Sequence, residues 1–224
     1  MGFFKRLDIK IITVLLMLYT IIGGFLMPVP KIPILNESIR NQYFHVSMWF
    51  SMMIVLIISV VYAIRYLSNG KKYNDILSLE TANAGVILGI LGIITGSIWA
   101  KFTWGAFWSG DPKQNGAAIA LLIYLAYFVL RGSFTDPQQR ARISAIYNIF
   151  AFSTLIPLLY ILPRLTDSLH PGSGGNPGFN IYDLDNSMRM VFYPSIIGWT
   201  MLILWISSLR VRMTLLKEKI DDNY

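Results

Sequence analysis

Six long runs without a charged residue divide this chain, and they constrain its fold more than any other feature. The runs cover residues 11–30, 41–64, 81–100, 114–130, 143–163 and 190–209. Each run is close to the ~20 residues that an α-helix needs to cross the hydrocarbon core of a bilayer. Strands of a membrane barrel would show short alternating segments instead, whereas helices satisfy their own backbone groups in lipid. The sequence therefore predicts an all-α polytopic membrane protein with six transmembrane helices.

The overall composition agrees with a membrane protein. Hydrophobic residues make up 54% of the chain and charged residues 14%, whereas a soluble domain carries about 25% charged residues. The net charge of +7 is distributed between the apolar runs, so we expect a lipid bilayer, and no nucleic acid, as a partner. The absence of cysteine excludes disulfides, thiol redox centres and thiolate metal sites.

The distribution of Lys and Arg predicts the orientation of the helices. If the N-terminus is cytoplasmic, 13 of the 19 basic residues lie inside, in agreement with the positive-inside rule. The remaining residues would lie outside, at Lys31, Arg40, Lys101, Lys113, Arg164 and Arg189. We therefore expect a multi-pass protein of the cytoplasmic (inner) membrane with both termini in the cytoplasm. We expect the first run to be a helix rather than a signal peptide, because it ends in Met-Pro-Val-Pro without a small-x-small cleavage site.

The chain is expected to form one six-helix membrane domain over residues 1–224. The inner connections, at 66–80 and 131–142, are short and polar, and the second contains the turn Asp136-Pro137. The outer connections comprise a loop at 101–116 between helices three and four and a loop at 164–189 between helices five and six. The latter includes a Gly- and Pro-rich stretch, and loops of this length are usually functional or disordered.

A stripe of glycines marks the third helix. Gly85, Gly89, Gly92 and Gly96 are spaced by four, three and four residues, which places them on one helical face. Small residues let a neighbouring element approach closely, so we predict a packing seam and a central position for this helix. The six runs contain no Asp, Glu, Lys or Arg. A proton- or ion-coupled transporter normally keeps such a group at depth, which counts against that class.

An aromatic cluster occupies the outer loop between the third and fourth helices. Trp104, Phe107 and Trp108 lie close together in the sequence, next to Gly105 and Gly110. Tryptophan offers a broad apolar face with few rotamers to freeze, and glycine permits the close approach of a flat ligand. An interfacial aromatic belt explains one or two aromatic residues per helix end, but not this density. The pattern therefore favours a binding surface.

The chain has two histidines, His45 near the outer end of the second helix and His170 in the last outer loop. The predicted topology puts both on the same side as the aromatic cluster. Imidazole is a common axial ligand of haem iron, and two imidazoles facing across a porphyrin would give six-coordinate iron. A single histidine at such a position is more often an ordinary interfacial polar residue, so the pattern leaves both interpretations open.

Several catalytic motifs are absent from the sequence. There is no Gly-x-x-x-x-Gly-Lys-Ser/Thr phosphate loop, no His-Glu-x-x-His and no Gly-x-Ser-x-Gly. Any ATP-driven step would therefore belong to another subunit, and we expect no enzymatic turnover by this chain.

The segment from Trp104 to Lys113 resembles the signature of the WWD haem-handling proteins of cytochrome c maturation, the CcmC/CcsA family. That signature is an outer loop of Trp-Gly-x-aromatic-Trp-x-Trp-Asp, often followed by Pro-Lys. The matching residues are Trp104, Gly105, Phe107, Trp108, Asp111, Pro112 and Lys113. Gly110 departs from it, because a third tryptophan is usual there. The resemblance extends over most of the chain, since six spans and one histidine in each flanking outer segment look like the CcmC branch.

The resemblance implies how such a site would work. His45 and His170 would be the axial ligands of the iron of haem b, and the loop would cradle the porphyrin. The loop residues of this platform would be Trp104, Gly105, Phe107, Trp108 and Asp111. Outer cations that could pair with the haem propionates are Arg40, Lys101, Lys113, Arg164 and Arg189. The family holds haem on the outer (periplasmic) face and helps to load it onto the haem chaperone CcmE, with the ABC subunits CcmA and CcmB and the small protein CcmD as partners.

Two other functions remain open from the sequence. A cytochrome b-like electron-transfer subunit would also bind haem through histidines, although such subunits place histidine pairs within facing helices. A transporter of haem or of another solute would also be a polytopic helical protein.

Overall fold

The structure is a computed structural model that describes residues 2–31, 33–170 and 184–221, and every regular element in these ranges is helical. Six helical spans are long and apolar enough to cross a membrane, which confirms the predicted all-α class and the number of spans. The long helices are α1 (Leu7–Leu26), α2 (His45–Asn69), α3 (Lys72–Trp104), α4 (Pro112–Gly132), α5 (Pro137–Ile156) and α7 (Asn186–Asp221). The short segments are η1 (Gly2–Lys5), η2 (Asn36–Tyr43), η3 (Pro157–Ile161) and α6 (Leu162–Leu165).

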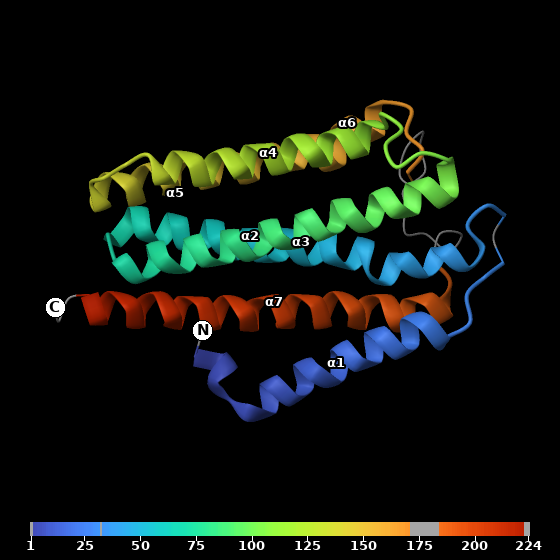
Figure 1. Cartoon of the computed structure of the whole chain (residues 1–224), viewed down its shortest axis with the longest axis horizontal. Helices are drawn as coiled ribbons and strands as arrows, with labels where there is room; N and C mark the ends of the chain where they lie inside the picture. Colours follow the sequence, from blue (N-terminus) through green and yellow to red (C-terminus); the bar gives the residue numbers. More distant parts are fainter. Residues whose placement is uncertain (1, 32, 171–183, 222–224) are drawn as a thin grey trace.

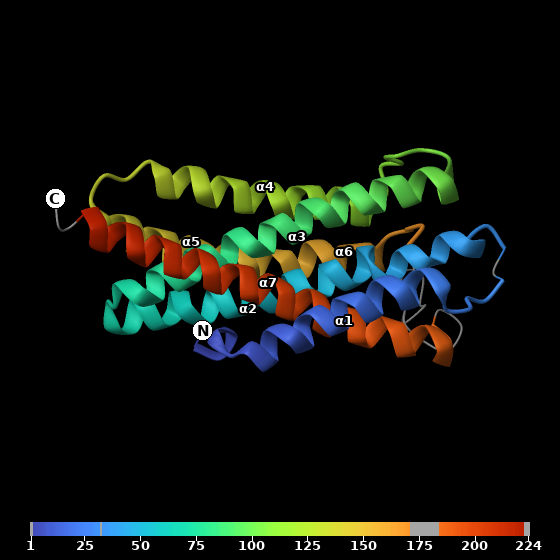
Figure 2. The same ribbon diagram turned by 60° about the horizontal axis from the view of Figure 1, so that its bottom comes forward.

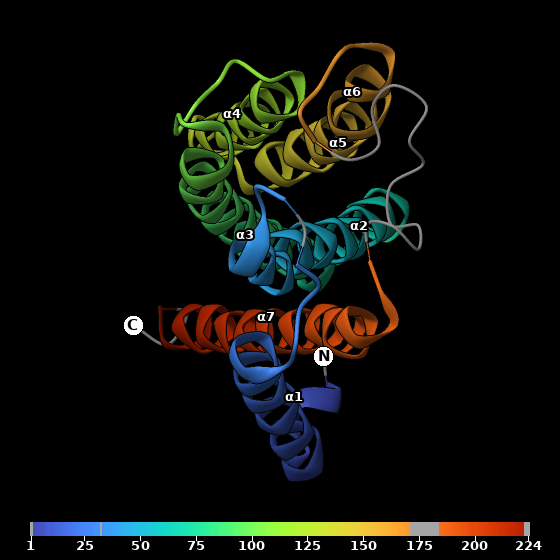
Figure 3. The ribbon, with the colours of Figure 1, turned by 90° about the vertical axis from the view of Figure 1, so that its right-hand side faces the viewer.

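The long helices stack in layers, which Figure 3 shows end-on. Helix α1 packs on α7, α7 packs on the α2–α3 pair, and α4 and α5 cover the opposite side of that pair. The largest interface joins α2 and α3. In the turned view of Figure 2, α3 crosses the bundle between α4 and α2. The central position predicted for the glycine-bearing helix is therefore confirmed.

The bundle has two ends that differ in what they carry (Figures 1 and 2). We call one the histidine end; it holds the start of α2, the last turn of α3 and the start of α4. We call the other the terminal end; it holds the α2–α3 turn, the α4–α5 turn and the C-terminal part of α7. The two ends therefore separate the aromatic loop from the basic inner connections of the sequence.

The glycine stripe of α3 faces α2, whose side chains lie so close that a Cβ would not fit. Four side chains of α2 occupy the space over the glycines: Leu56 over Gly85, Met52 over Gly89, Trp49 over Gly92 and His45 over Gly96. A Cβ at Gly92, for example, would lie 2.7 Å from Nε1 of Trp49. This geometry confirms the predicted packing seam, and the same seam positions one of the two histidines.

The helices at the terminal end extend beyond the uncharged runs. The polar connection expected at 66–80 is largely helical, because α2 continues to Asn69 and α3 begins at Lys72. Asp75 and Glu80 therefore lie within α3, and Glu80 is buried. The helices of the terminal end therefore include charged residues that lie outside the uncharged runs.

Ion pairs explain why these carboxylates can lie inside the bundle. Asp75 accepts two hydrogen bonds from the guanidinium group of Arg131, at 2.7 and 2.6 Å. Glu80 accepts a hydrogen bond from Arg210 at 2.5 Å and one from the hydroxyl of Thr214 at 3.0 Å. Because each charge is paired and hydrogen-bonded, much of the desolvation cost of burying it is offset.

Two aspartates begin α4 and α5 in the same way. Asp111 accepts a hydrogen bond from the backbone N–H of Lys113 at 2.8 Å, and Asp136 accepts one from Gln139 at 2.6 Å. A proline follows each aspartate, and its missing N–H costs nothing at the first position of a helix. The turn predicted at Asp136-Pro137 is therefore the N-terminal cap of α5.

Helices extend into both of the outer connections predicted at 101–116 and 164–189. The first connection has only residues 105–111 outside the helices; of the second, residues 164–165 belong to α6 and residues 186–189 to α7, and the described non-helical residues are 166–170 and 184–185. Its Gly- and Pro-rich stretch lies within 171–183, which is outside the described residues. The site residue predicted in the second loop, His170, is described and lies shortly after α6.

Candidate functional site

His45 is the first residue of α2 and lies over the glycine stripe of α3. Its Nδ1 atom is 2.8 Å from the backbone carbonyl oxygen of Gly92 and 3.3 Å from the hydroxyl oxygen of Thr95. A carbonyl oxygen can only accept, so Nδ1 is the nitrogen that carries the proton in the neutral ring. The lone pair of the imidazole is therefore on Nε2.

Two tryptophans hold the ring of His45 at its edges. Trp49, one turn along α2, lies 6.5 Å from it between ring centroids at 78°, and Trp99 of α3 lies 6.0 Å away at 77°. Trp99 is itself held by a 3.1 Å hydrogen bond from its indole N–H to the hydroxyl of Ser38. Edge-to-face contacts of this kind limit ring rotation and are favourable beyond burial alone.

His170 lies after α6 and contacts residues at both ends of the aromatic loop, Trp104 and Asp111. Its Nδ1 atom donates to Oδ1 of Asp111 at 2.9 Å, and its ring lies 4.8 Å from that of Trp104 at 73°. The Asp111 carboxylate can only accept when it is ionised, so the neutral ring of His170 also has its lone pair on Nε2. Both histidines therefore present the same ring nitrogen as a possible ligand atom.

Asp111 joins α4 to the segment after α6. Its side chain is 1% exposed, and besides Lys113 and His170 it accepts hydrogen bonds from the hydroxyl of Ser168 at 2.9 Å and from the backbone N–H of Leu169 at 2.7 Å. Burial by itself would raise the pKa of Asp111, but the bonds from His170, Leu169 and Ser168 outweigh it and hold that pKa below its usual value. Asp111 is therefore an anion that fixes the position of residues 168–170.

The loop at 105–111 folds back onto the first turn of α4. Gly105 ends α3 with φ +84° and Gly110 has φ +75°, a left-handed conformation that other residues adopt at a cost. Gln114 accepts from the backbone N–H and the hydroxyl of Ser109, both at 3.0 Å. Asn115 donates to the carbonyl oxygen of Gly110 at 2.9 Å. A tryptophan at position 110 would therefore strain this turn.

The folded loop at 105–111 leaves two aromatic rings exposed. Phe107 is 58% exposed and Trp108 is 43% exposed, and the indole N–H of Trp108 donates to Asn115 at 3.0 Å. Lys101 donates to the carbonyl oxygen of Gly105 at 2.9 Å, and its ammonium group lies 5.8 Å from the ring of Phe107. These contacts orient an exposed apolar surface in the loop that follows Trp104.

The outer cations differ in what they already bind. Arg40 is committed to the end of α1, because it donates to the carbonyl oxygen of Met27 at 2.5 Å and pairs with Glu37 at 2.6 Å. Lys113 is half-buried at the start of α4, directly after Asp111 and Pro112. Lys113 is therefore an outer cation next to the aspartate that holds His170.

The structure brings most of the predicted site residues together and adds three that sequence reasoning missed. Trp104, Asp111 and His170 are in contact, whereas His45 lies over Gly96 of α3, about two turns before Trp104, and is in ring contact with Trp99. The additional residues are Gln114, Asn115 and Ser168. Gln114 and Asn115 could have been sought as polar residues in the first turn after the Asp-Pro cap, but no signal in the sequence pointed to Ser168.

The donor set of this site suits a haem better than a bare metal ion. Within the described ranges, no group of three or more His, Cys, Asp or Glu residues is placed to hold a metal ion. Two imidazoles at the same end of the bundle as exposed aromatic rings are instead the ligands and the apolar surface that a six-coordinate haem requires. The fold and the site together define a class of protein: a six-span membrane protein with two tryptophan-flanked histidines at one end of its bundle.

Comparison with known families agrees with this class. Residues 5–224 match the model of the CcmC family, described as heme exporter protein C. Because the match covers nearly the whole chain, the chain belongs to the heme exporter protein C family. The resemblance found in the sequence is therefore confirmed.

Individual relatives carry the same or a related name. The chain is 25% identical over 194 residues to heme exporter protein C of Haemophilus influenzae. The aligned region covers 82% of this chain and 74% of that protein. The corresponding protein of Bradyrhizobium diazoefficiens is 24% identical over 187 residues, covering 83% and 70%. Cytochrome c biogenesis protein CcsA of Prochlorococcus marinus is 42% identical over 76 residues, but this match covers 34% of this chain and only 24% of that protein. These names support a role in cytochrome c maturation.

Proposed function

We propose that this chain binds haem b at its histidine end, with His45 and His170 as the axial ligands of the iron. One observation carries the proposal: each histidine is bonded at Nδ1, to Gly92 at 2.8 Å and to Asp111 at 2.9 Å. A bond at Nδ1 fixes the tautomer and the orientation of the ring, which is the usual support of a histidine that ligates a metal through Nε2. Because the chain has no cysteine, the haem would be held without thioether bonds.

The two ligands differ in the charge of their hydrogen-bond partners. Gly92 offers His45 a neutral carbonyl, whereas Asp111 offers His170 a buried carboxylate. A carboxylate partner raises the basicity of the imidazole more than a carbonyl does. His170 is therefore the stronger ligand in this proposal, and His45 is the one that gives way when haem leaves.

The aromatic loop supplies the platform for the porphyrin. Trp104 lies against His170, while Gly105 leaves open space and Phe107 and Trp108 present exposed rings. Most of the haem surface is apolar, so such a platform at the edge of the bilayer buries the ring and leaves the propionates toward water. We assign one propionate to Lys113.

We infer that the bound haem is passed to the haem chaperone CcmE during the biogenesis of c-type cytochromes. The chain then acts as a presenting component without enzymatic turnover, together with the ABC subunits CcmA and CcmB and the small protein CcmD. The positive-inside distribution of Lys and Arg supports a location in the inner membrane with the histidine end at the periplasmic face. Family membership supports the partners.

Haem transfer between purified proteins tests this function. The chain is loaded with haem, mixed with purified apo-CcmE, and the haem on each protein is measured after separation. We expect transfer to CcmE, and we expect the double substitution Phe107→Ala with Trp108→Ala to slow it. The matched control is Phe102→Ala, another exposed aromatic residue at the end of α3, which should transfer normally. If CcmE takes up free haem as fast as haem from the loaded chain, the presenting role is wrong.

A further inference from the structure

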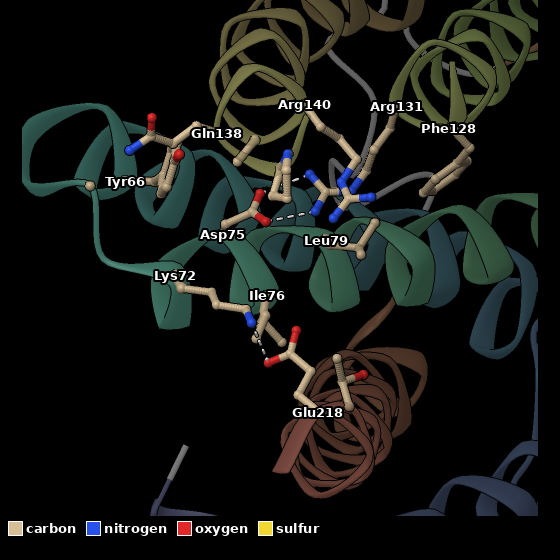
Figure 4. A pocket seen from close by; sticks show the side chains of 15 residues that line it. Tyr66, Lys72, Asp75, Ile76, Leu79, Phe128, Arg131, Gln138, Arg140 and Glu218 are labelled. Carbon is tan, nitrogen blue, oxygen red and sulfur yellow. Dashed lines mark hydrogen bonds and ion pairs between the residues drawn. The ribbon is translucent and has the colours of Figure 1, made fainter. Parts of the chain in front are cut away.

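A cavity lies at the terminal end of the bundle, far from the histidines. It has a volume of about 530 Å³ and is bounded by α2, α3 and α7 on one side and by the α4–α5 hairpin on the other, a size typical of small-molecule sites. Its charged lining residues are Lys72, Arg131, Arg140, Asp75 and Glu218. Figure 4 shows Arg131 and Arg140 reaching into the same part of the cavity.

The carboxylates of this cavity are already neutralised by two of its cations. Asp75 is bonded to Arg131 through both oxygens, and their side chains are only 12% and 11% exposed. Glu218 pairs with Lys72 at 3.0 Å. Neither carboxylate is therefore left to balance a third positive charge.

Arg140 is that third charge. It takes part in none of the ion pairs found in the described part of the chain, and its Nε atom is buried without a hydrogen-bond partner. A buried donor of this kind costs free energy unless something accepts its hydrogen bond. The cavity thus has an excess of one positive charge and an unused donor.

The uncharged lining of the cavity is largely apolar. Ile76 and Leu79 of α3 and Phe128 of α4 contribute to its wall (Figure 4). A ligand that satisfies both the arginine and these side chains must combine an anionic group with hydrocarbon. Basic pockets between membrane helices are sites where anionic lipid headgroups bind.

We propose that this cavity binds the phosphodiester headgroup of an anionic membrane lipid, such as phosphatidylglycerol, with Arg140 as its principal partner. A phosphodiester carries one negative charge and so matches the single unbalanced cation, whereas inorganic phosphate or a nucleotide brings more. The lipid would bridge α5 to α3 and α7, across the gap between the α4–α5 hairpin and the rest of the bundle. This site is independent of haem.

Lipid retention by the purified full chain tests the site. The chain is exchanged into neutral detergent, supplied with phosphatidylglycerol or phosphatidylcholine, and examined by native mass spectrometry and thermal unfolding. We expect one retained phosphatidylglycerol and a higher melting temperature, with phosphatidylcholine giving neither because its choline cancels the charge. The substitution Arg140→Gln should weaken binding about tenfold or more, since it removes a hydrogen bond between charged groups.

Two further variants test whether a loss of lipid binding comes from the cavity itself, and not from misfolding or from the loss of one positive charge. Arg142→Gln removes the same charge two residues later at an exposed position outside the cavity lining, and it should bind lipid normally. Arg140→Lys keeps the charge and should recover part of the affinity. Equal retention of both lipids, equal loss in Arg142→Gln, or the same stabilisation by inorganic phosphate alone would each overturn the proposal.

Discussion

The substitution Asp111→Asn probes the link between the aromatic loop and His170. The carboxylate accepts four hydrogen bonds, two at Oδ1 from Lys113 and His170 and two at Oδ2 from Ser168 and Leu169. Asparagine has one oxygen and one NH₂ group, so two of these donors would face another donor. In either orientation of the amide, the segment at residues 168–170 or the cap of α4 loses its partner.

The size of the effect follows from the bonds that are lost. Hydrogen bonds to a charged group are worth about 1.5–3 kcal/mol each, and losing two of them costs about 3 kcal/mol at the low end. This free energy corresponds to a factor of about 100 in the equilibrium that holds His170 in place. If His170 is an axial ligand, haem should dissociate from the variant up to about 100-fold faster.

Transfer of haem to excess apomyoglobin measures this dissociation rate. The matched control is Asp136→Asn, the same change at the cap of α5, where the carboxylate accepts from Gln139 and no histidine is involved. Asparagine caps helices about as well as aspartate, so this variant should release haem at the wild-type rate. Equal dissociation rates for wild type, Asp111→Asn and Asp136→Asn would refute the reasoning.

Three further predictions concern the seam, the ion pairs and the loop. Gly96→Ala should lower the haem content per chain, because the new Cβ would overlap the ring of His45. The control Gly132→Ala, whose Cβ meets nothing within 4 Å, should leave the haem content unchanged. Equal haem content in the two variants would contradict the role of the seam. Arg131→Gln should destabilise the chain by about 3 kcal/mol in detergent unfolding, because it leaves the Asp75 carboxylate uncompensated, and adding Asp75→Asn should restore much of the loss. No recovery in the double variant would mean that the pair is not the cause. Gly110→Ala should cost about 1 kcal/mol for its left-handed backbone, measured by thermal unfolding, and an unchanged melting temperature would show that the loop relaxes without strain.

The membrane helices could be predicted because their signal is local. Uncharged runs such as 41–64 and 81–100 mark the core of each helix directly. Their ends could not be predicted in the same way, because Asp75 and Glu80 are tolerated inside α3 only through arginines on α4 and α7. Such pairing depends on the tertiary arrangement, which the charge pattern of one segment does not contain.

The candidate site, too, could be predicted from the sequence only in part. That His45, His170 and the aromatic loop share one end follows from the alternation of the helices, which the sequence predicts. The bond between Asp111 and His170 does not, because it joins residues 59 positions apart. It depends on the close approach of α4 to η3, where Gly116 lies against the backbone carbonyl of Leu158.

The central claim is that His45 and His170 both ligate haem iron. Electron paramagnetic resonance and visible absorption of the purified, ferric, haem-loaded chain test it most directly, in wild type and in the single variants His45→Ala and His170→Ala. We predict a low-spin, bis-imidazole signal in wild type that changes to a high-spin signal, or disappears with the haem, in each variant. An unchanged low-spin signal and unchanged haem content in both variants would contradict the claim.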